Sequence, residues 1–197
     1  MLAAAGMMPA HATSYGGAAD CRFAALEPAP AAADAVRWTG ACKDGYAEGK
    51  GSLQWTANGG KYTIEASLVR GEISGEAKLT SRQGIYTGML KNGLPHGQGY
   101  VEYANQGGWY EGAFVNGQPE GPGIYLAADR SKYTGYWKDG KRHGLGEQSF
   151  ALGGSYHGYW QNDVFHGRGT IVYAGSARRY EGEFIDGRPA GVPAPVG

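Results

Sequence analysis

Residues 133–146 read Tyr-Thr-Gly-Tyr-Trp-Lys-Asp-Gly-Lys-Arg-His-Gly-Leu-Gly, and the pattern of this stretch returns along most of the chain. If the first tyrosine is position 0, glycine follows at +2, an aromatic residue at +4, glycine at +7, often histidine at +10, and glycine at +11 and +13. Such a repeat predicts an array of small stacked units. Copies start 22 to 26 residues apart, at Trp38, Ile64, Tyr86, Tyr110, Tyr133, Tyr156 and Tyr180.

The composition divides the chain into four parts. We expect residues 38–191 to form the repeat array, residues 13–37 an Ala- and Pro-rich N-terminal arm, and residues 192–197 a Pro-rich C-terminal tail. Residues 1–12 carry no Asp, Glu, Lys or Arg and end in Ala-His-Ala, which is typical of a signal-peptide remnant with its cleavage site. This run has no basic N-terminal region. Either the true start therefore lies upstream, or the run is only an Ala-rich leader.

Each copy of the pattern predicts a β-hairpin. Positions 0, +2 and +4 share one face of a strand, because side chains alternate with a period of two. An Asn-Gly or Asp-Gly pair follows at +6 and +7 in five of the copies, and glycine there can adopt the positive φ of a tight hairpin turn. Positions +11, +13, +15 and +17 share a face of the return strand. The hairpins together predict one long, twisted antiparallel sheet.

One face of this sheet alternates large rings with bare glycine. We expect the rings to lie in the slots that the glycines leave, because aromatic cover offsets the weakness of glycine in a strand. The residues to which we assign this structural role are Tyr86, Gly88, Gly93, Gly97, Tyr110, Gly112, Phe114, Tyr133, Gly135, Trp137, Gly140, Gly144, Tyr156, Gly158, Trp160, Gly167, Tyr180, Gly182 and Phe184.

The pattern Tyr-x-Gly-x-Trp-Lys-Asp-Gly-Lys-x-His-Gly-x-Gly resembles the MORN (membrane occupation and recognition nexus) repeat. The resemblance covers about residues 38–191. The sequence departs from the pattern at the starts Trp38 and Ile64, at Asp163 in place of glycine at +7, and at Pro193 in place of glycine at +13. The resemblance implies an all-β, elongated half-pipe solenoid of about seven stacked hairpins. It also implies an interaction module, with scaffolding, self-association through terminal repeats and phospholipid binding as family roles.

The sequence offers no catalytic motif. A Gly-x-Ser-x-Gly elbow, a His-Glu-x-x-His pair and a phosphate-binding loop are all missing from it, so we expect neither an enzyme nor a cofactor. His96, His143 and His166 share position +10. Equivalent positions of successive hairpins lie about 10 Å apart, too far for ligands that each approach zinc to about 2 Å. We therefore expect no metal site, and we expect these histidines to order their loops by hydrogen bonding.

Charge and hydropathy argue against nucleic-acid binding and against a membrane-spanning helix. Lys plus Arg and Asp plus Glu each number 18, so the formal net charge is zero, and no overall field attracts nucleic acid. A membrane-spanning helix needs about 20 apolar residues in succession, and the sequence contains no such run.

Two surface features are candidate contacts for a ligand or partner. Tyr136 and Tyr159 both occupy +3, on the face opposite to the predicted buried rings. There they would stack on a protein partner or on sugar rings, or would only cover the outer face of the sheet. Lys141 and Arg142 form the most basic turn of the array. Either a lipid headgroup phosphate docks at this turn, or water surrounds it.

Cys21 and Cys42 are the two cysteines of the chain and lie on either side of the boundary between arm and array. In an exported protein, a disulfide between them would attach the arm to the first copy and contribute about 3 kcal/mol. The alternative is two ordinary thiols, with Cys42 filling the aromatic position +4.

From these observations we expect a non-catalytic binding or scaffolding module that contacts another protein in the cell envelope, in a bacterial-type periplasm. The alternatives are peripheral binding to phospholipid membranes through the basic turn, carbohydrate or cell-wall binding through the surface tyrosines, and a cytoplasmic location. An open sheet leaves two edge strands with unpaired backbone groups. Self-association through the terminal repeats is therefore a further expectation.

Overall fold

The molecule is described here by a computed structural model. It covers residues 15–16, 20–30, 36–176 and 178–191. The expected signal-peptide remnant and the expected C-terminal tail lie outside the described residues. Within the described part the chain forms strands and turns and no helix.

The strands follow one another with only short connections. They are β1 (Tyr15–Gly16), β2 (Phe23–Ala24), β3 (Arg37–Trp38), β4 (Ala41–Lys43), β5 (Tyr46–Ala57), β6 (Gly60–Val69), β7 (Glu72–Ser81), β8 (Gly84–Lys91), β9 (Leu94–Tyr103), β10 (Trp109–Val115), β11 (Gln118–Leu126), β12 (Lys132–Lys138), β13 (Lys141–Ser149), β14 (Gly154–Gln161), β15 (Val164–Tyr173), β16 (Arg179–Ile185) and β17 (Arg188–Pro189).

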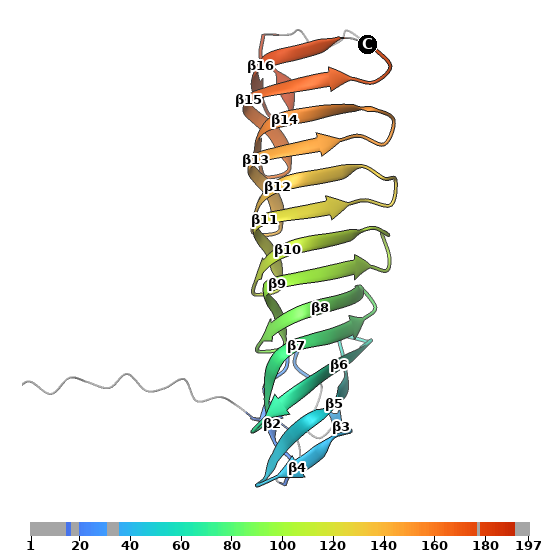
Figure 1. Cartoon of the computed structure of the whole chain (residues 1–197), viewed down its shortest axis with the longest axis vertical. Coiled ribbons are helices and arrows are strands. Elements are labelled where there is room, and N and C mark those ends of the chain that lie inside the picture. Colours follow the sequence, from blue (N-terminus) through green and yellow to red (C-terminus); the bar gives the residue numbers. More distant parts are fainter. Residues whose placement is uncertain (1–14, 17–19, 31–35, 177, 192–197) are drawn as a thin grey trace, which may run out of the picture.

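One antiparallel sheet contains almost all of these strands. From β5 to β17 each strand pairs with its neighbours in sequence, so the sheet is a ladder of consecutive hairpins (Figure 1). At the other end, β3 and β4 pair with different parts of β5. β1 and β2 form a small separate sheet. The expected all-β, elongated antiparallel array is thereby confirmed.

The hairpin turns follow from local chemistry. Asp139 and Gly140, between β12 and β13, both have positive φ, 50° and 75°, as a two-residue type I′ turn requires. In the copy that starts at Tyr156, the turn residues are Asn162 and Asp163, with φ of 50° and 71°. Asp163 thus adopts a left-handed conformation without being glycine, at a cost of about 1 kcal/mol.

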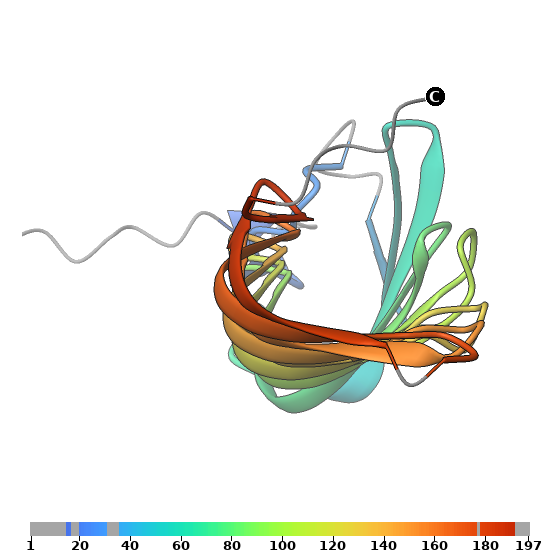
Figure 2. The same cartoon turned by 90° about the horizontal axis from the view of Figure 1, so that it is seen from above.

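A bulge bends each hairpin. Gly135 pairs with Gly146 but Trp137 pairs with Arg142, so one residue of β12 faces three of β13. Gly144 accommodates the extra length with a φ of 69°. The same shift occurs between β8 and β9, β10 and β11, and β14 and β15. Because bulges bend a strand and increase its twist, the sheet forms an open trough when it is viewed along its long axis (Figure 2).

The tyrosines at position 0 lie over glycines on the concave face. A methyl group added to Gly135 would lie 2.5 Å from the Tyr133 hydroxyl oxygen, and one added to Gly146 would meet the same ring. The Tyr133 hydroxyl donates a hydrogen bond of 2.9 Å to the backbone carbonyl of Tyr136. The equivalent bond to the carbonyl at +3 is made by Tyr86, Tyr110, Tyr156 and Tyr180.

From the copy that starts at Tyr110 onward, the ring at +4 links each copy to the one before. Trp137 lies edge-to-face with Tyr133 of its own copy, at 5.3 Å between centroids, and with Tyr110 of the preceding copy, at 5.1 Å. Trp160 makes the same two contacts with Tyr156 and Tyr133. Edge-to-face pairs contribute about 1 kcal/mol each beyond their buried area. The unbroken row of such pairs therefore holds successive hairpins in register.

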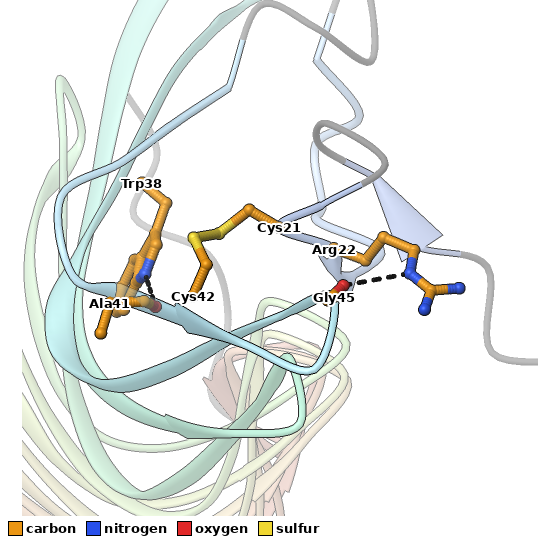
Figure 3. Close-up of a disulfide and its surroundings, with 6 residues drawn as sticks. All are labelled: Cys21, Arg22, Trp38, Ala41, Cys42 and Gly45. Atoms are coloured by element: carbon orange, nitrogen blue, oxygen red, sulfur yellow. Dashed lines mark hydrogen bonds between the residues drawn. A yellow bond between two sulfur atoms is a disulfide. The ribbon is translucent and has the colours of Figure 1, made fainter.

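The N-terminal arm is attached to the first hairpin by a disulfide. Cys21 and Cys42 are bonded, with their Cα atoms 5.3 Å apart, so the structure selects the disulfide from the two alternatives that the sequence leaves open. Beside it, the Arg22 side chain donates a hydrogen bond to the Gly45 carbonyl at 3.1 Å, through its Nε (Figure 3). The described part of the arm around Cys21 and Arg22 is therefore part of the folded domain.

Beyond the disulfide, the arm closes the N-terminal end of the trough. Phe23 and Leu26 are almost fully buried in one core with Leu53 and Trp55 of β5. The Trp55 indole Nε1 donates a hydrogen bond of 2.9 Å to the carbonyl of Pro28. Figure 2 shows this N-terminal segment, in blue, on the open side of the trough. Within the described residues, the first hairpins thus have a second layer that the later ones lack.

The two ends of the sheet differ. At the N-terminal end, β3 and β4 cover β5. At the C-terminal end, β17 pairs with Phe184 and Ile185, and the Ala190 N–H donates a hydrogen bond of 2.7 Å to the Glu183 carbonyl. Among the described residues no strand pairs with residues 179–182 on that side, so within this part of the chain the C-terminal edge is the open one.

Candidate functional site

The convex face carries a row of exposed apolar side chains that we call the convex strip: Pro122, Tyr136, Leu145 and Tyr159. Pro122 pairs with Tyr136 across β11 and β12, and Leu145 pairs with Tyr159 across β13 and β14. Tyr136, Leu145 and Tyr159 are 54%, 47% and 49% exposed. The sheet therefore brings the two predicted tyrosines together with two apolar neighbours on four adjacent strands.

A polar row borders the convex strip on the same face. Thr134, Glu147, His157 and Thr170 follow one another in register from β12 to β15. Beside Leu145, a shallow hollow of about 270 Å³ opens over the aligned glycines and is lined by His157, Arg168, Thr170 and Glu181. The strip thus has the arrangement of an interaction surface, with an apolar centre and hydrogen-bonding groups at its margin.

The structure separates the roles of the two predicted basic residues. Lys141 is exposed at the start of β13. The Arg142 Nε lies 2.9 Å from Oδ1 of Asp163, and its Nη2 donates to the Asp163 carbonyl at 3.0 Å. Its guanidinium also lies 4.2 Å from the ring centroid of Trp160. Arg142 therefore connects two copies, which differs from the free basic turn expected from the sequence.

Gln148 completes this cluster. Its Oε1 accepts a hydrogen bond of 2.8 Å from Nη1 of Arg142, and the residue is 7% exposed at the ring position +15 of its copy. Sequence reasoning missed the cluster, although it noted Asp163 at +7. Two departures from the repeat pattern could together have predicted the pair. One is Asp163 in place of glycine at +7, and the other is the arginine at +9 of the preceding copy.

Burial suppresses ionisation of the tyrosines in the trough. It raises the pKa of Tyr86 and Tyr156 to about 12. It also raises the pKa of Tyr110 and Tyr133, as the main cause in both. These hydroxyls therefore stay protonated at neutral pH and act as hydrogen-bond donors within the sheet.

The histidines at +10 lie apart from one another, one in each of three copies. The Nδ1 atoms of His96, His143 and His166 are buried without a hydrogen-bond partner among the described residues. The hydrogen bond that we expect to order each loop is therefore not made at this atom. In the same part of the chain, no group of three or more His, Cys, Asp or Glu side chains gathers in a metal-binding arrangement.

The concave face also contains a groove, which the sequence did not predict. This concave groove has a volume of about 400 Å³ and lies between Pro28 of the arm and Pro119 of β11. Tyr62, Tyr103 and Phe114 are among the rings that line it. It exists because the arm closes one end of the trough and leaves the next hairpins uncovered.

The described residues form a β-hairpin solenoid with two candidate binding surfaces, the convex strip and the concave groove. The model of the MORN repeat matches residues 40–59, 86–108, 110–132, 133–154, 156–178 and 180–192. These stretches make up more than half of the chain, which therefore belongs to the MORN repeat family. MORN repeats are generally binding or scaffolding modules without catalytic activity.

The copy that starts at Ile64 lies outside the matched stretches, although β6 and β7 form its hairpin. Among curated proteins, none matches the chain. No helix in the described ranges has the length and apolar character needed to cross a membrane.

Proposed function

We propose that this protein is a non-catalytic scaffold that binds another protein through the convex strip. The observation that carries the proposal is the exposure of Tyr136, Leu145 and Tyr159, side by side on a rigid sheet. Contiguous exposed apolar groups mark interaction sites in soluble proteins. Tyrosine is also a residue type enriched among those that dominate binding energy.

A protein partner is favoured over a lipid surface. Of the two basic residues considered for headgroups, Arg142 already binds Asp163 and covers Trp160. Only Lys141 has its charge free of such a pair. Peripheral binding to anionic lipid gains about 1 kcal/mol for each basic residue near the surface. With Arg142 engaged, the turn keeps the exposed Lys138 and Lys141, and two lysines on a chain of zero net charge give too small a gain for stable attachment.

A protein partner is also favoured over a glycan. Sugar rings present hydroxyl groups that need hydrogen-bond partners, because unsatisfied polar groups are costly to bury. Leu145 occupies the position between the two tyrosine rings and has no such group to offer. An apolar side chain of a polypeptide can pack on Leu145, beside the two rings, without this cost.

The proposal includes export to an oxidising compartment. The disulfide between Cys21 and Cys42 supports it, because disulfides persist in the periplasm and outside the cell and are rare in the cytosol. Cell fractionation with a C-terminal tag checks this part. Recovery of the tagged chain with cytosolic markers and with free thiols would contradict it.

The test of the binding proposal is affinity capture from a cell-envelope extract of the host, with the partner then purified and titrated directly. The strip variant Tyr136→Ser with Tyr159→Ser should bind the partner at least ten-fold more weakly. The control is Val69→Ser with Val115→Ser, which alters apolar residues that are 53% and 43% exposed away from the strip. Equal weakening by both variants would refute the convex strip as the site.

Two further experiments test the alternatives, one with the additional variant Lys141→Glu and one with the strip variant. Binding to phosphatidylserine-containing vesicles that is lost in the Lys141→Glu variant would favour the hypothesis of membrane binding. Saturable binding of cell-wall glycan fragments that is lost in the strip variant would favour the hypothesis of carbohydrate binding. Either result, without a protein partner, would replace our proposal.

Within the part of the chain that the structure describes, the outer edge of residues 179–182 pairs with no strand. This open edge supports self-association as a second form of scaffolding, because such edges can pair with another strand. Sedimentation over a range of concentrations tests it. Replacing Glu181 with proline removes a backbone donor at this edge and should shift any dimer toward monomer. A monomer at all concentrations would exclude this form.

A further inference from the structure

The concave groove arises from one row of residues across the sheet. Trp55 pairs with Tyr62, Ser81 pairs with Gly84, and Gly84 pairs with Tyr103. The row therefore places rings at both ends and two small residues in the middle. Tyr62 on β6 and Tyr103 on β9 are three strand spacings apart, about 14 Å. The hollow between them faces the open side of the trough and is distinct from the convex strip.

The arm shows how this row holds a polypeptide. Trp55 donates its indole hydrogen to the Pro28 carbonyl at 2.9 Å, and its ring stacks on Tyr62 with the centroids 5.2 Å apart. Pro28 itself lines the end of the groove. Grooves lined with aromatic residues are a recurrent means of holding proline-containing segments. In this chain, the contact made intramolecularly is a hydrogen bond from an aromatic ring of the row to the backbone carbonyl of a proline residue.

Tyr103 repeats the position of Trp55 two copies further on. Both residues occupy +17, in the copies that start at Trp38 and Tyr86. The Tyr103 hydroxyl makes no hydrogen bond within the described ranges, whereas the hydroxyl of Tyr86 is bound to the carbonyl of Met89. Burial raises the pKa of Tyr103 to about 12, so its hydroxyl stays protonated. The groove therefore presents an unused donor on β9, three strands from Tyr62.

The repeat spacing matches one backbone conformation. Equivalent positions of successive copies are two strands apart, about 9.6 Å, and one turn of polyproline II takes three residues and about 9.3 Å. Leu79 and Val101, both at +15, and Pro95 and Pro119, both at +9, line the groove at this spacing. Every third residue of such a ligand would meet the same environment in the next copy.

We propose that the concave groove binds a proline-containing segment of another protein in the polyproline II conformation. The segment lies between Pro28 and Phe114, and Tyr103 donates its hydroxyl hydrogen to one of its backbone carbonyls. Polyproline II suits this site because the conformation is preformed and its carbonyl groups are not bonded within the segment. This site is additional to the proposed convex strip, and the two together give the protein two separate binding faces.

The test uses the full chain and a fluorescent synthetic peptide with proline at every third position and alanine between. Fluorescence anisotropy should show saturable binding, and a peptide with alanine in place of every proline should not bind. Tyr103→Phe keeps the ring and removes the donor, so the peptide should bind about five-fold more weakly. The matched control is Tyr100→Phe on the convex face, where the hydroxyl donates to Glu102. This variant should bind like the unaltered protein.

Any of the following results would overturn the proposal: no saturable binding by the folded chain, equal binding of both peptides, or the same affinity for the Tyr103→Phe and Tyr100→Phe variants. Circular dichroism and thermal unfolding establish that each variant is folded. The strip variant Tyr136→Ser with Tyr159→Ser should bind the peptide normally, so the failure of one proposed site leaves the other testable. Loss of peptide binding in the strip variant would show that the peptide binds at the convex face, and would contradict the concave site.

Discussion

Arg142 and Asp163 belong to neighbouring copies, and the Nε of Arg142 lies 2.9 Å from Oδ1 of Asp163. Oδ1 also accepts a hydrogen bond of 3.0 Å from the backbone N–H of Arg142, and the backbone N–H of Asp163 donates in return to the Arg142 carbonyl at 3.1 Å. The side-chain pair thus reinforces a backbone contact between the turn of one hairpin and the return strand of the previous one.

This pair predicts a non-additive pattern of stabilities. Arg142→Ala should lower the free energy of unfolding by about 2 kcal/mol, because it removes charged hydrogen bonds and the cation–π contact. Asp163→Gly should cost less than Asp163→Ala, since glycine relieves the left-handed strain. A double-mutant cycle measured by urea unfolding should give a coupling free energy of about 1 kcal/mol. This coupling is smaller than that of a buried pair, because both side chains are partly exposed. Purely additive losses would show that the two side chains do not interact.

The glycines beneath the tyrosines should tolerate no side chain. Gly135→Ala places a methyl group 2.5 Å from the Tyr133 hydroxyl oxygen, and overpacking of this kind costs about 1–3 kcal/mol. Gly60→Ala is the matched control, because its nearest contact would be at 3.6 Å. Thermal and urea unfolding of the two variants measure the difference. Similar stabilities would mean that the rings do not depend on the glycine slots.

Alkaline pH should destabilise the array. The folded-state pKa of Tyr86 and Tyr156 is about 12, whereas an unfolded tyrosine has a pKa near 10. Between these values the unfolded state binds fewer protons than the folded one, so stability falls as pH rises. Below pH of about 10 both states keep these hydroxyls protonated, and the tyrosines contribute no slope.

Urea unfolding at a series of pH values measures this slope. Tyr156→Phe should make the decline above pH of about 10 shallower, and it should lower stability at neutral pH by about 1 kcal/mol through the lost hydrogen bond to the Tyr159 carbonyl. A decline of unchanged slope in this variant would assign the alkaline transition to other groups.

Reduction of the disulfide should loosen the N-terminal end selectively. Cys21 and Cys42 close a loop with a sequence separation of 21, for which the loop-entropy model gives about 3 kcal/mol. Hydrogen exchange after reduction, or in Cys21→Ser with Cys42→Ser, should accelerate in β2 to β6. The strands from β10 to β16 should exchange as before, because each hairpin contacts mainly its neighbours. Uniform acceleration along the array would contradict this local role.

The periodic part of the molecule could be predicted well from its sequence. Tyr133, Gly135 and Trp137 alternate at the period of a strand, and the Asp139-Gly140 pair predicts a two-residue turn. These signals are local, since they depend on residues within one hairpin. The face on which Tyr136 and Tyr159 lie follows from the same alternation.

Other features depend on contacts between copies, which local signals do not encode. Leu145 joins Tyr136 and Tyr159 only because a bulge shifts the register within one hairpin and the next strand then pairs with it. The residues around Arg142 in the sequence are typical of a solvated basic turn. In the structure, however, its side chain contacts Asp163 of the next copy. Pairing of this kind needs the stacking geometry of successive hairpins.

The sequence by itself determined the repeat, the hairpin and the alternation of rings with glycine, because these follow from the conformational preferences of adjacent residues. Tertiary structure alone decided that the arm folds back onto Trp55, that Tyr103 faces an open groove, and that Arg142 is held by the next copy. The physical reason is that these contacts join residues far apart in the chain. Their formation depends on the curvature and register of the whole sheet.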